Sequence, residues 1–140
     1  MLETGQPAHD VPLGARGVFT KTVSESDVYL YAGITGDFSP NHIDEVFMGA
    51  GKYGRRIAHG AMLIGFMSAA SAKVYLGRTV SLGYDRIRFV GPVFFGDTVM
   101  TEYVIREYDP GKRRIYADVT CRNQRGETVA VAVNIRAFVD

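Results

Sequence analysis

The stretch HGAMLIGFMSAASAKVYL, residues 59–76, decides the fold. It is apolar around most of its circumference, which predicts a helix enclosed by protein and not one lying on a surface. Small side chains let a helix backbone approach a neighbouring sheet closely. This stretch is rich in them, with Gly60, Ala61, Gly65, Ala69, Ala70 and Ala72. We therefore expect a long helix over 59–76 that a sheet embraces.

After this helix, apolar residues recur at every second position, which is typical of β-strands. Turn residues at 109–111 and 124–126 indicate hairpins, and the alternation slips near Gly83, where a bulge is expected. The strands are predicted at about 17–23, 80–90, 99–105, 115–121 and 129–139. The sequence thus predicts an α+β domain in which a curved antiparallel sheet wraps around a long central helix.

Between the first strand and the central helix, the sequence predicts two helices around an irregular loop. Ser24 can begin a capping box for a helix over 25–35, and Gly36 suits its left-handed end. Pro40 disfavours helical geometry in the preceding residue, so 37–42 is expected to be a tight irregular loop. A short helix over 44–48 and a glycine-rich basic connection follow.

Composition limits the class of protein. The chain has 140 residues, of which 46% are hydrophobic and 22% charged, as in one globular domain. The net charge of +1 offers no electrostatic footprint for nucleic acid or an anionic membrane, and 59–76 is shorter than a bilayer span. The single cysteine, Cys121, cannot form an internal disulfide, and its strand pattern predicts burial. We expect a cytoplasmic protein that binds neither nucleic acid nor membrane.

Residues 1–16 lack periodicity and are expected to form a loosely held N-terminal arm in front of a single domain at 17–140. His9, within this arm, is expected to be incidental. One sheet of this kind leaves an open edge. Pairing that edge, or packing two sheets back to back, makes a homodimer the expected smallest unit, with higher homo-oligomers left open.

Asp37 and His42 lie five positions apart in the predicted loop. A carboxylate and an imidazole can move protons near neutral pH, which suits general acid-base chemistry on water. The alternative is that Asp37 only turns the chain and His42 is a hydrogen-bonded loop histidine. Taken alone, the pair does not decide between the two.

The start of the predicted central helix offers further groups. Its free amides and positive dipole end can receive an oxyanion, and Gly60 would let a ligand approach closely. Ser68 lies on nearly the same helix face and could orient His42. The alternatives are helix packing for Gly60 and a back-bond for Ser68. His59 is expected to fix the loop by a hydrogen bond, and its spacing from Asp37 and His42 matches no recognised metal site, so no metal is expected.

Three segments resemble the MaoC-like dehydratases and R-specific enoyl-CoA hydratases, which have the hot-dog fold. They are YAGITGDFSPNHIDEVFM (31–48), YGRRIAHGAMLIGFMS (53–68) and IRFVGPVFFGDTV (87–99). The resemblance covers about 19–138, and its G-D-F-x-P-x-H core is specific when A-H-G follows at this distance. It implies a hydro-lyase that converts a trans-2-enoyl thioester to an R-3-hydroxyacyl thioester, or the reverse. No cofactor is implied beyond the acyl carrier, which is coenzyme A or an acyl carrier protein.

Carried over to this sequence, the resemblance implies that Asp37 and His42 form the catalytic pair around the attacking water. The Gly60 amide would hold the thioester oxygen, and Ser68 would support the pair. Which member of the pair handles which proton is left open. A thioesterase shares the fold, but the loop motif belongs to the hydratase branch. The alternative from another class is a non-catalytic acyl-thioester-binding or structural subunit.

This sequence departs from the family pattern at Ser39, where asparagine is frequent, at Asn41, where an aliphatic residue is frequent, and at Ala61. A polar group beside the pair favours a substrate that satisfies it, so a branched or functionalised acyl chain is expected. Cations near the channel mouth would bind the phosphates of the carrier, although each is also explained as a surface charge. The candidates are Lys52, Arg55, Arg56, Arg86 and Arg88.

Overall fold

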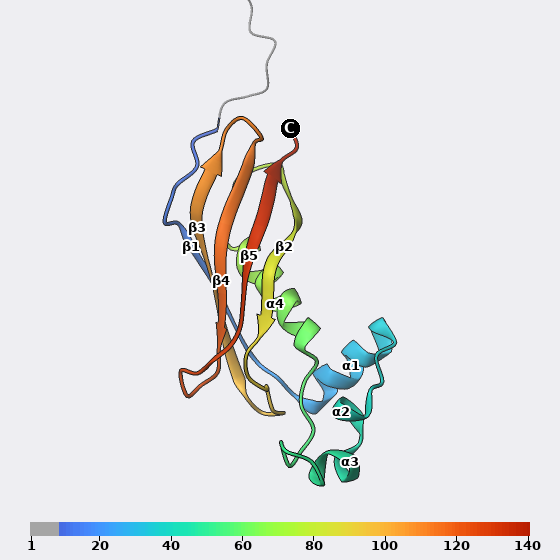
Figure 1. Cartoon of the computed structure of the whole chain (residues 1–140). Helices are drawn as coiled ribbons and strands as arrows, with labels where there is room; N and C mark the ends of the chain where they lie inside the picture. Colours follow the sequence, from blue (N-terminus) through green and yellow to red (C-terminus); the bar gives the residue numbers. More distant parts are fainter. Residues whose placement is uncertain (1–8) are drawn as a thin grey trace, which may run out of the picture.

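Five antiparallel strands form one curved sheet in residues 9–140, the part of the chain that the computed structural model describes (Figure 1). The order of the strands across the sheet is β1-β3-β4-β5-β2. The elements are β1 (Arg16–Thr22), α1 (Glu25–Thr35), α2 (Pro40–Ile43), α3 (Glu45–Gly49), α4 (Gly60–Ala72), β2 (Thr79–Phe89), β3 (Thr98–Asp109), β4 (Arg114–Arg122) and β5 (Thr128–Phe138). The α+β architecture expected from the sequence, a curved sheet around a long helix, is confirmed.

Helix α4 packs against the inner face of the sheet and forms the core with it. Met62, Leu63, Met67 and Ala70 are its buried residues, and they lie in one cluster with inward side chains of β3, β4 and β5. Strand β1 comes so close to α4 that a Cβ on Gly17 would lie 2.4 Å from the carbonyl oxygen of Ala70. The close approach of helix and sheet was expected, but here it depends on a strand glycine.

The opposite face of α4 is exposed in the single chain, which corrects the expectation of a helix enclosed on all sides. The exposed residues at helical spacing are Ala61, Gly65, Ser68 and Ala72. The sheet covers only one side of the helix. An apolar sequence indicates that a helix will be covered, but it does not distinguish the chain's own sheet from another molecule.

Helices α1, α2 and α3 gather at the end of the sheet where α4 begins (Figure 1). The predicted capping box of α1 is present at Ser24, and Gly36 ends the helix with φ 84°. The prediction of an irregular loop over 37–42 is wrong for the second half of this segment, because Pro40 is the first residue of α2. Proline lacks an amide hydrogen and has a fixed φ, so it suits the first turn of a helix. His42 consequently lies on a helix turn.

Strand β2 is an edge strand with two register shifts. One lies between Ser81 and Gly83, as the broken alternation predicted, and the other between Asp85 and Arg88. Arg86 adopts φ 55° at the second shift. No helix within 9–140 has both the length and the apolar character needed to cross a membrane.

The segment predicted as a loose arm is attached to the domain from His9 onward; residues 1–8 lie outside the described part. The imidazole of His9 stacks on Phe138 at 3.5 Å and lies 3.0 Å from a guanidinium nitrogen of Arg113. The backbone at 14–15 hydrogen-bonds to Ile105. Residues 9–15 are therefore held against the domain, and His9 is not incidental.

The predicted burial of Cys121 is confirmed, and burial raises the pKa of its thiol.

Candidate active site

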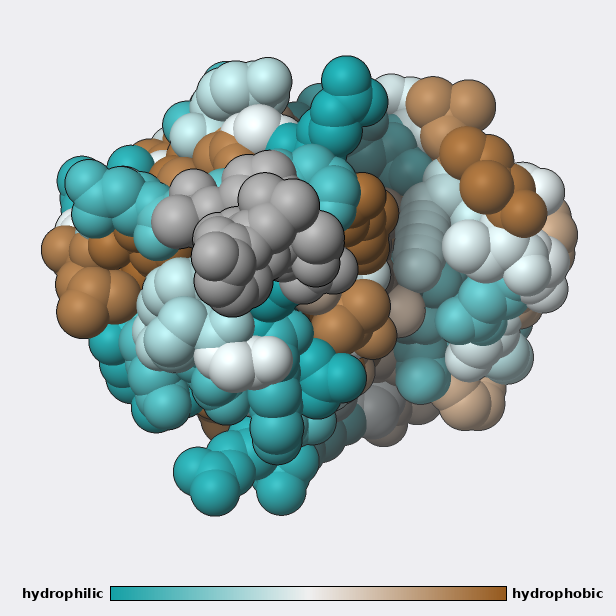
Figure 2. Space-filling model, turned by 90° about the horizontal axis from the view of Figure 1, so that it is seen from above, coloured by the Kyte–Doolittle hydropathy of each residue, from teal (hydrophilic) through white to brown (hydrophobic). Residues whose placement is uncertain are grey.

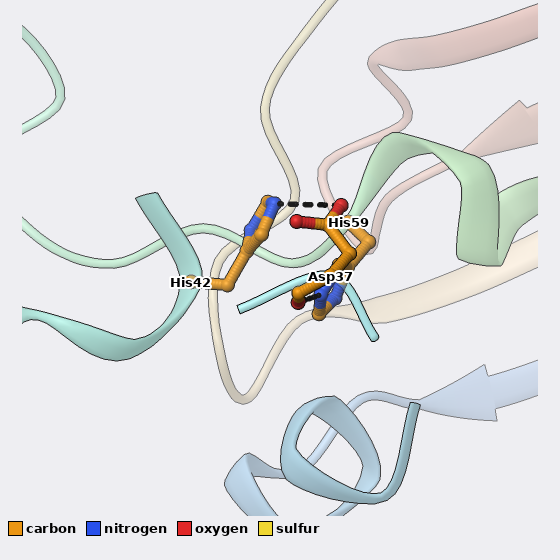
Figure 3. Close-up of side chains that lie close together, drawn as sticks. All are labelled: Asp37, His42 and His59. Atoms are coloured by element: carbon orange, nitrogen blue, oxygen red, sulfur yellow. Dashed lines mark hydrogen bonds and ion pairs between the residues drawn. The ribbon is translucent and has the colours of Figure 1, made fainter. Parts of the chain in front are cut away.

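Asp37 follows the end of α1, and His42 lies on α2. The carboxylate of Asp37 faces the imidazole of His42 (Figure 3). Asp37 Oδ2 lies 3.9 Å from His42 Nε2, and the two side chains are 52% and 10% exposed. Asp37 Oδ1 accepts a hydrogen bond from the Ser39 amide at 3.1 Å. The turn-forming role and the proton-transfer role considered for Asp37 therefore use different oxygens and are compatible.

A backbone carbonyl fixes the tautomer of His42. Its Nδ1 lies 2.8 Å from the carbonyl oxygen of Ile57, and a carbonyl can only accept, so Nδ1 carries a hydrogen. In the neutral ring, the lone pair is then on Nε2, the atom that faces Asp37. A separation of 3.9 Å is too long for a direct hydrogen bond but lets one water contact both atoms.

The backbone at residues 57–58, which includes the Ile57 carbonyl, is held by hydrogen bonds from two sides. The Ile57 amide donates to the Asn41 carbonyl at 3.0 Å, and the Ala58 amide donates to the Val93 carbonyl at 2.7 Å. The chain that supplies the carbonyl to His42 is thus tied to α2 and to the loop between β2 and β3. Ile57 escaped sequence reasoning because a backbone carbonyl acts independently of its side chain and leaves no residue signal.

His59 completes the cluster (Figure 3). It is 2% exposed, its Nε2 lies 2.9 Å from the carbonyl oxygen of Asp37, and its ring stacks on His42 at 3.7 Å with 26° between the planes. The ring of Tyr31 meets His59 edge-on at 4.7 Å. The structure thus brings together Asp37, His42 and His59, and His59 bonds to the loop as the sequence suggested.

Ligand atoms of Asp37, His42 and His59 all lie within 4.8 Å of one another, so metal binding was considered. His42 Nδ1 and His59 Nε2 are already directed at backbone carbonyls. The remaining ring nitrogens belong to stacked imidazoles, so their lone pairs lie in two separate planes inclined by only 26°, whereas the ligands of a metal ion must converge on one point. The arrangement favours proton transfer over metal coordination.

A cavity of about 530 Å³ opens beside this cluster. Its polar lining includes Asn41, His42, Lys52, His59 and Gly60, and apolar residues such as Leu63 and Phe89 form the rest. His42 and the beginning of α4 therefore face one space of a size that suits a small-molecule ligand.

Gly60, the first residue of α4, lines this cavity, and no side chain caps the helix, since His59 at the N-cap makes no capping hydrogen bond. Uncapped amides and the helix dipole can stabilise a negative oxygen. Gly60 also has a packing reason, because a Cβ there would lie 3.0 Å from the ring of Phe89. Packing and ligand approach are thus both compatible with glycine at this position.

Ser68 is not brought to the pair within the single chain. It lies on the exposed face of α4, and no hydrogen bond joins it to Asp37 or His42 in the described structure. Eight residues of helix place it about 12 Å along the axis from Gly60. Helical periodicity predicts the face on which Ser68 lies but not this distance.

The five basic candidates differ in position. Lys52 lines the cavity, and the Arg55 guanidinium lies nearby, 4.0 Å above the ring of Phe94. Arg88 is exposed and hydrogen-bonds to the carbonyl of Ile87. Arg86 lines a separate hollow with residues of β4 and β5. Lys52 and Arg55 are therefore the candidates for contact with the phosphates of a ligand in the cavity.

Arg56 has a structural role that the sequence did not show. Its guanidinium contacts Glu25 Oε2 at 2.6 Å, Glu45 Oε2 at 2.9 Å and the Tyr29 hydroxyl at 2.6 Å. Its hydrogen bonds hold the pKa of the Glu45 carboxyl below its ordinary value. Arg56 therefore joins α1 to α3, and its donors are engaged, which argues against the expected phosphate contact.

Comparison with known proteins places this geometry among related chains. A family model described as "MaoC like domain" matches residues 11–126. The (R)-specific enoyl-CoA hydratase of Rhodospirillum rubrum is 33% identical over 112 residues, 80% of this chain and 78% of that protein. The 3-hydroxybutyryl-CoA dehydratase of Methylorubrum extorquens is 34% identical over 112 residues, 80% of this chain and 71% of that protein. The unliganded R-hydratase PhaJ1 of Pseudomonas aeruginosa superposes with a TM-score of 0.82 at 31% identity, over 93% of this chain and 84% of that one.

Proposed function

The chain belongs to the MaoC-like domain family, and we propose that it is a hydro-lyase that interconverts trans-2-enoyl and R-3-hydroxyacyl thioesters. The observation that carries the proposal is the tautomer of His42. Its Nδ1 is bonded to the Ile57 carbonyl, so Nε2 is directed at Asp37 beside a cavity that also receives the uncapped start of α4. The relatives named as enoyl-CoA hydratase and 3-hydroxybutyryl-CoA dehydratase support the same reaction.

In the hydration direction, a water between Asp37 Oδ2 and His42 Nε2 attacks the β carbon of the enoyl group. His42 Nε2 accepts a proton from this water as the new C–O bond forms. The electron pair of the C=C bond moves toward the thioester oxygen, where the Gly60 amide stabilises the enolate. The α carbon then takes a proton from the pair, and the Asp37 carboxylate stabilises the imidazolium in between. One water is consumed, and the reverse sequence is dehydration.

We infer that the acyl carrier, coenzyme A or an acyl carrier protein, is the only additional group required. Lys52 and Arg55 at the cavity are the cations that would contact its phosphates. Neither residue has an ion-pair partner within 4.0 Å in the described residues, in contrast to Arg56.

The acyl group is proposed to be branched or functionalised. Asn41 lines the cavity beside His42 and adds a donor and an acceptor that a plain hydrocarbon would leave unpaired. Values of kcat/KM for crotonyl-CoA and for enoyl-CoA substrates that carry a hydroxyl, carboxylate or methyl branch test this directly. A clear preference for crotonyl-CoA contradicts it.

We propose a homodimer as the smallest assembly. Apolar side chains reach the surface in several places (Figure 2), and they include Leu30 and Ile34 on α1 and Val80 and Leu82 on the edge strand β2. The small-residue face of α4 is exposed as well. Exposed apolar side chains on helix faces and on an edge strand favour contact with a second copy of the chain. Sedimentation equilibrium that returns only the 15.4 kDa monomer contradicts the dimer.

The reaction is tested by mixing the protein with enoyl-CoA thioesters and following the loss of the conjugated chromophore. Turnover that disappears in Asp37→Asn and His42→Ala supports the hydro-lyase. Binding without turnover on a broad panel indicates the non-catalytic alternative. Release of free coenzyme A thiol indicates a thioesterase.

A further inference from the structure

We propose that His59 is a positioning residue that holds the Asp37–His42 pair at a fixed distance from the oxyanion-binding start of α4. The inference rests on the proposed function and deepens it. It assigns to His59 a task in the reaction, although the residue itself transfers no proton.

The first contact is with the backbone of Asp37. His59 Nε2 lies 2.9 Å from the Asp37 carbonyl oxygen, and since that oxygen can only accept, Nε2 carries the hydrogen. His59 also immediately precedes Gly60, the first residue of α4. One residue therefore links the carboxylate that contacts the water to the amide that would hold the thioester oxygen.

The second contact is with His42. The two imidazoles stack at 3.7 Å with 26° between their planes. The ring of Tyr31 makes a T-shaped contact with the His59 ring at 4.7 Å. Stacking restricts rotation of the His42 ring about its χ2 angle, while Ile57 fixes its tautomer. His59 thus touches both members of the pair, one through a hydrogen bond and the other through its ring.

An unpaired atom shows that packing alone does not explain this histidine. Its Nδ1 is buried and has no hydrogen-bond partner within residues 9–140. An apolar ring at position 59 would fill the same space without this cost. The side chain also makes no capping bond to α4. The contact that only a nitrogen can make is the donation to Asp37.

Two substitutions separate the hydrogen bond from the ring. His59→Phe keeps a stacking ring but removes the donor, and His59→Gln keeps an amide donor but removes the ring. We expect His59→Phe to lower kcat by about 10- to 100-fold, as loss of an orienting contact does, with KM changed less than about threefold. His59→Gln should lose clearly less of kcat than His59→Phe, because it keeps the donor to Asp37 and loses only the stacking on His42. Wild-type kcat in His59→Phe, or equal losses in both variants, would overturn the assignment of the donor.

The matched control is His9→Phe. His9 is also a stacked histidine, but it lies against Phe138 near the C-terminus. Its substitution should leave kcat unchanged, and a loss similar to that of His59→Phe would overturn a specific role for His59.

Amide hydrogen exchange at Ser39 gives a readout that is independent of turnover. The Ser39 amide donates to Asp37 Oδ1, so it reports whether the loop is held. It should exchange faster in His59→Phe than in the wild type and in His59→Gln. If the wild type is inactive on all enoyl thioesters, the proposed function fails, whereas unchanged Ser39 exchange in His59→Phe overturns the positioning role.

Discussion

The carbonyl oxygen of Ile57 lies 2.8 Å from Nδ1 of His42, and this contact decides which nitrogen of the imidazole can act as a base. With the hydrogen held on Nδ1, neutral His42 presents Nε2 toward Asp37 Oδ2. The Ile57 carbonyl therefore orients the imidazole, as the single carboxylate does in Ser-His-Asp triads.

Gly60→Ala separates the packing role of the glycine from its role at the thioester oxygen. The added methyl group would lie 3.0 Å from the Phe89 ring, so we expect a loss of about 1–2 kcal/mol in unfolding free energy and a lower kcat. Adding Phe89→Leu should restore stability but not kcat. Recovery of both in the double variant would show that Gly60 serves packing alone.

The control is Gly33→Ala in α1, where a Cβ would meet nothing within 4 Å. Alanine is the better helix former, so this variant should gain up to about 1 kcal/mol in stability. Its kcat should stay at the wild-type value, which distinguishes a specific effect at Gly60 from a general effect of methyl groups.

Lys52→Ala and Arg56→Gln should affect different properties. Lys52 lines the cavity, and its loss should raise KM for acyl-CoA by about two- to fivefold, the range of an exposed ion pair. The difference in KM between Lys52→Ala and the wild type should shrink as salt is added, because screening weakens the phosphate contact in the wild type.

Arg56→Gln should instead lower the Tm by detaching α1 from α3. A large KM effect with unchanged Tm in Arg56→Gln would contradict its structural role.

Asp27→Ala should destabilise the protein at neutral pH but not in acid. Its capping bond to the Ser24 amide lowers the pKa of the Asp27 carboxyl, and capping residues contribute about 0.5–2 kcal/mol. Because the folded-state pKa is lowered, the contribution is present above the unfolded pKa and is lost as pH falls through the folded one. Urea unfolding at neutral pH and at about pH 2 measures this. An equal difference at both pH values contradicts it.

Cys121 should resist thiol reagents in the native protein. Burial in β4 raises the pKa of its thiol, so little thiolate forms near neutral pH, and its side chain is 0% exposed. Ellman's reagent should react at the rate of unfolding and rapidly in denaturant. Rapid reaction of the native protein would contradict the burial.

Period-two patterns and a long apolar helix were sufficient to predict the sheet and α4. Two features of the fold could not be predicted from the sequence, for physical reasons. Pro40 both disfavours helix in the residue before it and suits the first turn of a helix after it, and only the second effect produces α2. The apolar character of α4 indicates coverage, although the sheet covers just one face.

For the site, the sequence identified side chains but not their backbone partners. Asp37 and His42 were recognised as a pair, and His59 was expected to fix the loop. The carbonyls that orient them, those of Ile57 and Asp37, could not be read from residue types. Ser68 was expected to support the pair, and within the single chain it lies away from it, because helical periodicity gives the face of a residue and not its height along the axis.

The most direct test of the account is the hydration of trans-2-enoyl-CoA by the wild type beside Asp37→Asn and Asp44→Asn, with chiral analysis of the product. Asp44 caps α3 through the Phe47 amide in the same segment, and asparagine can keep that bond. We expect an R-3-hydroxyacyl-CoA product, a loss of about 10²–10⁴-fold in kcat for Asp37→Asn, and near wild-type turnover for Asp44→Asn. Equal turnover in Asp37→Asn and Asp44→Asn, or no hydration by the wild type, would contradict it.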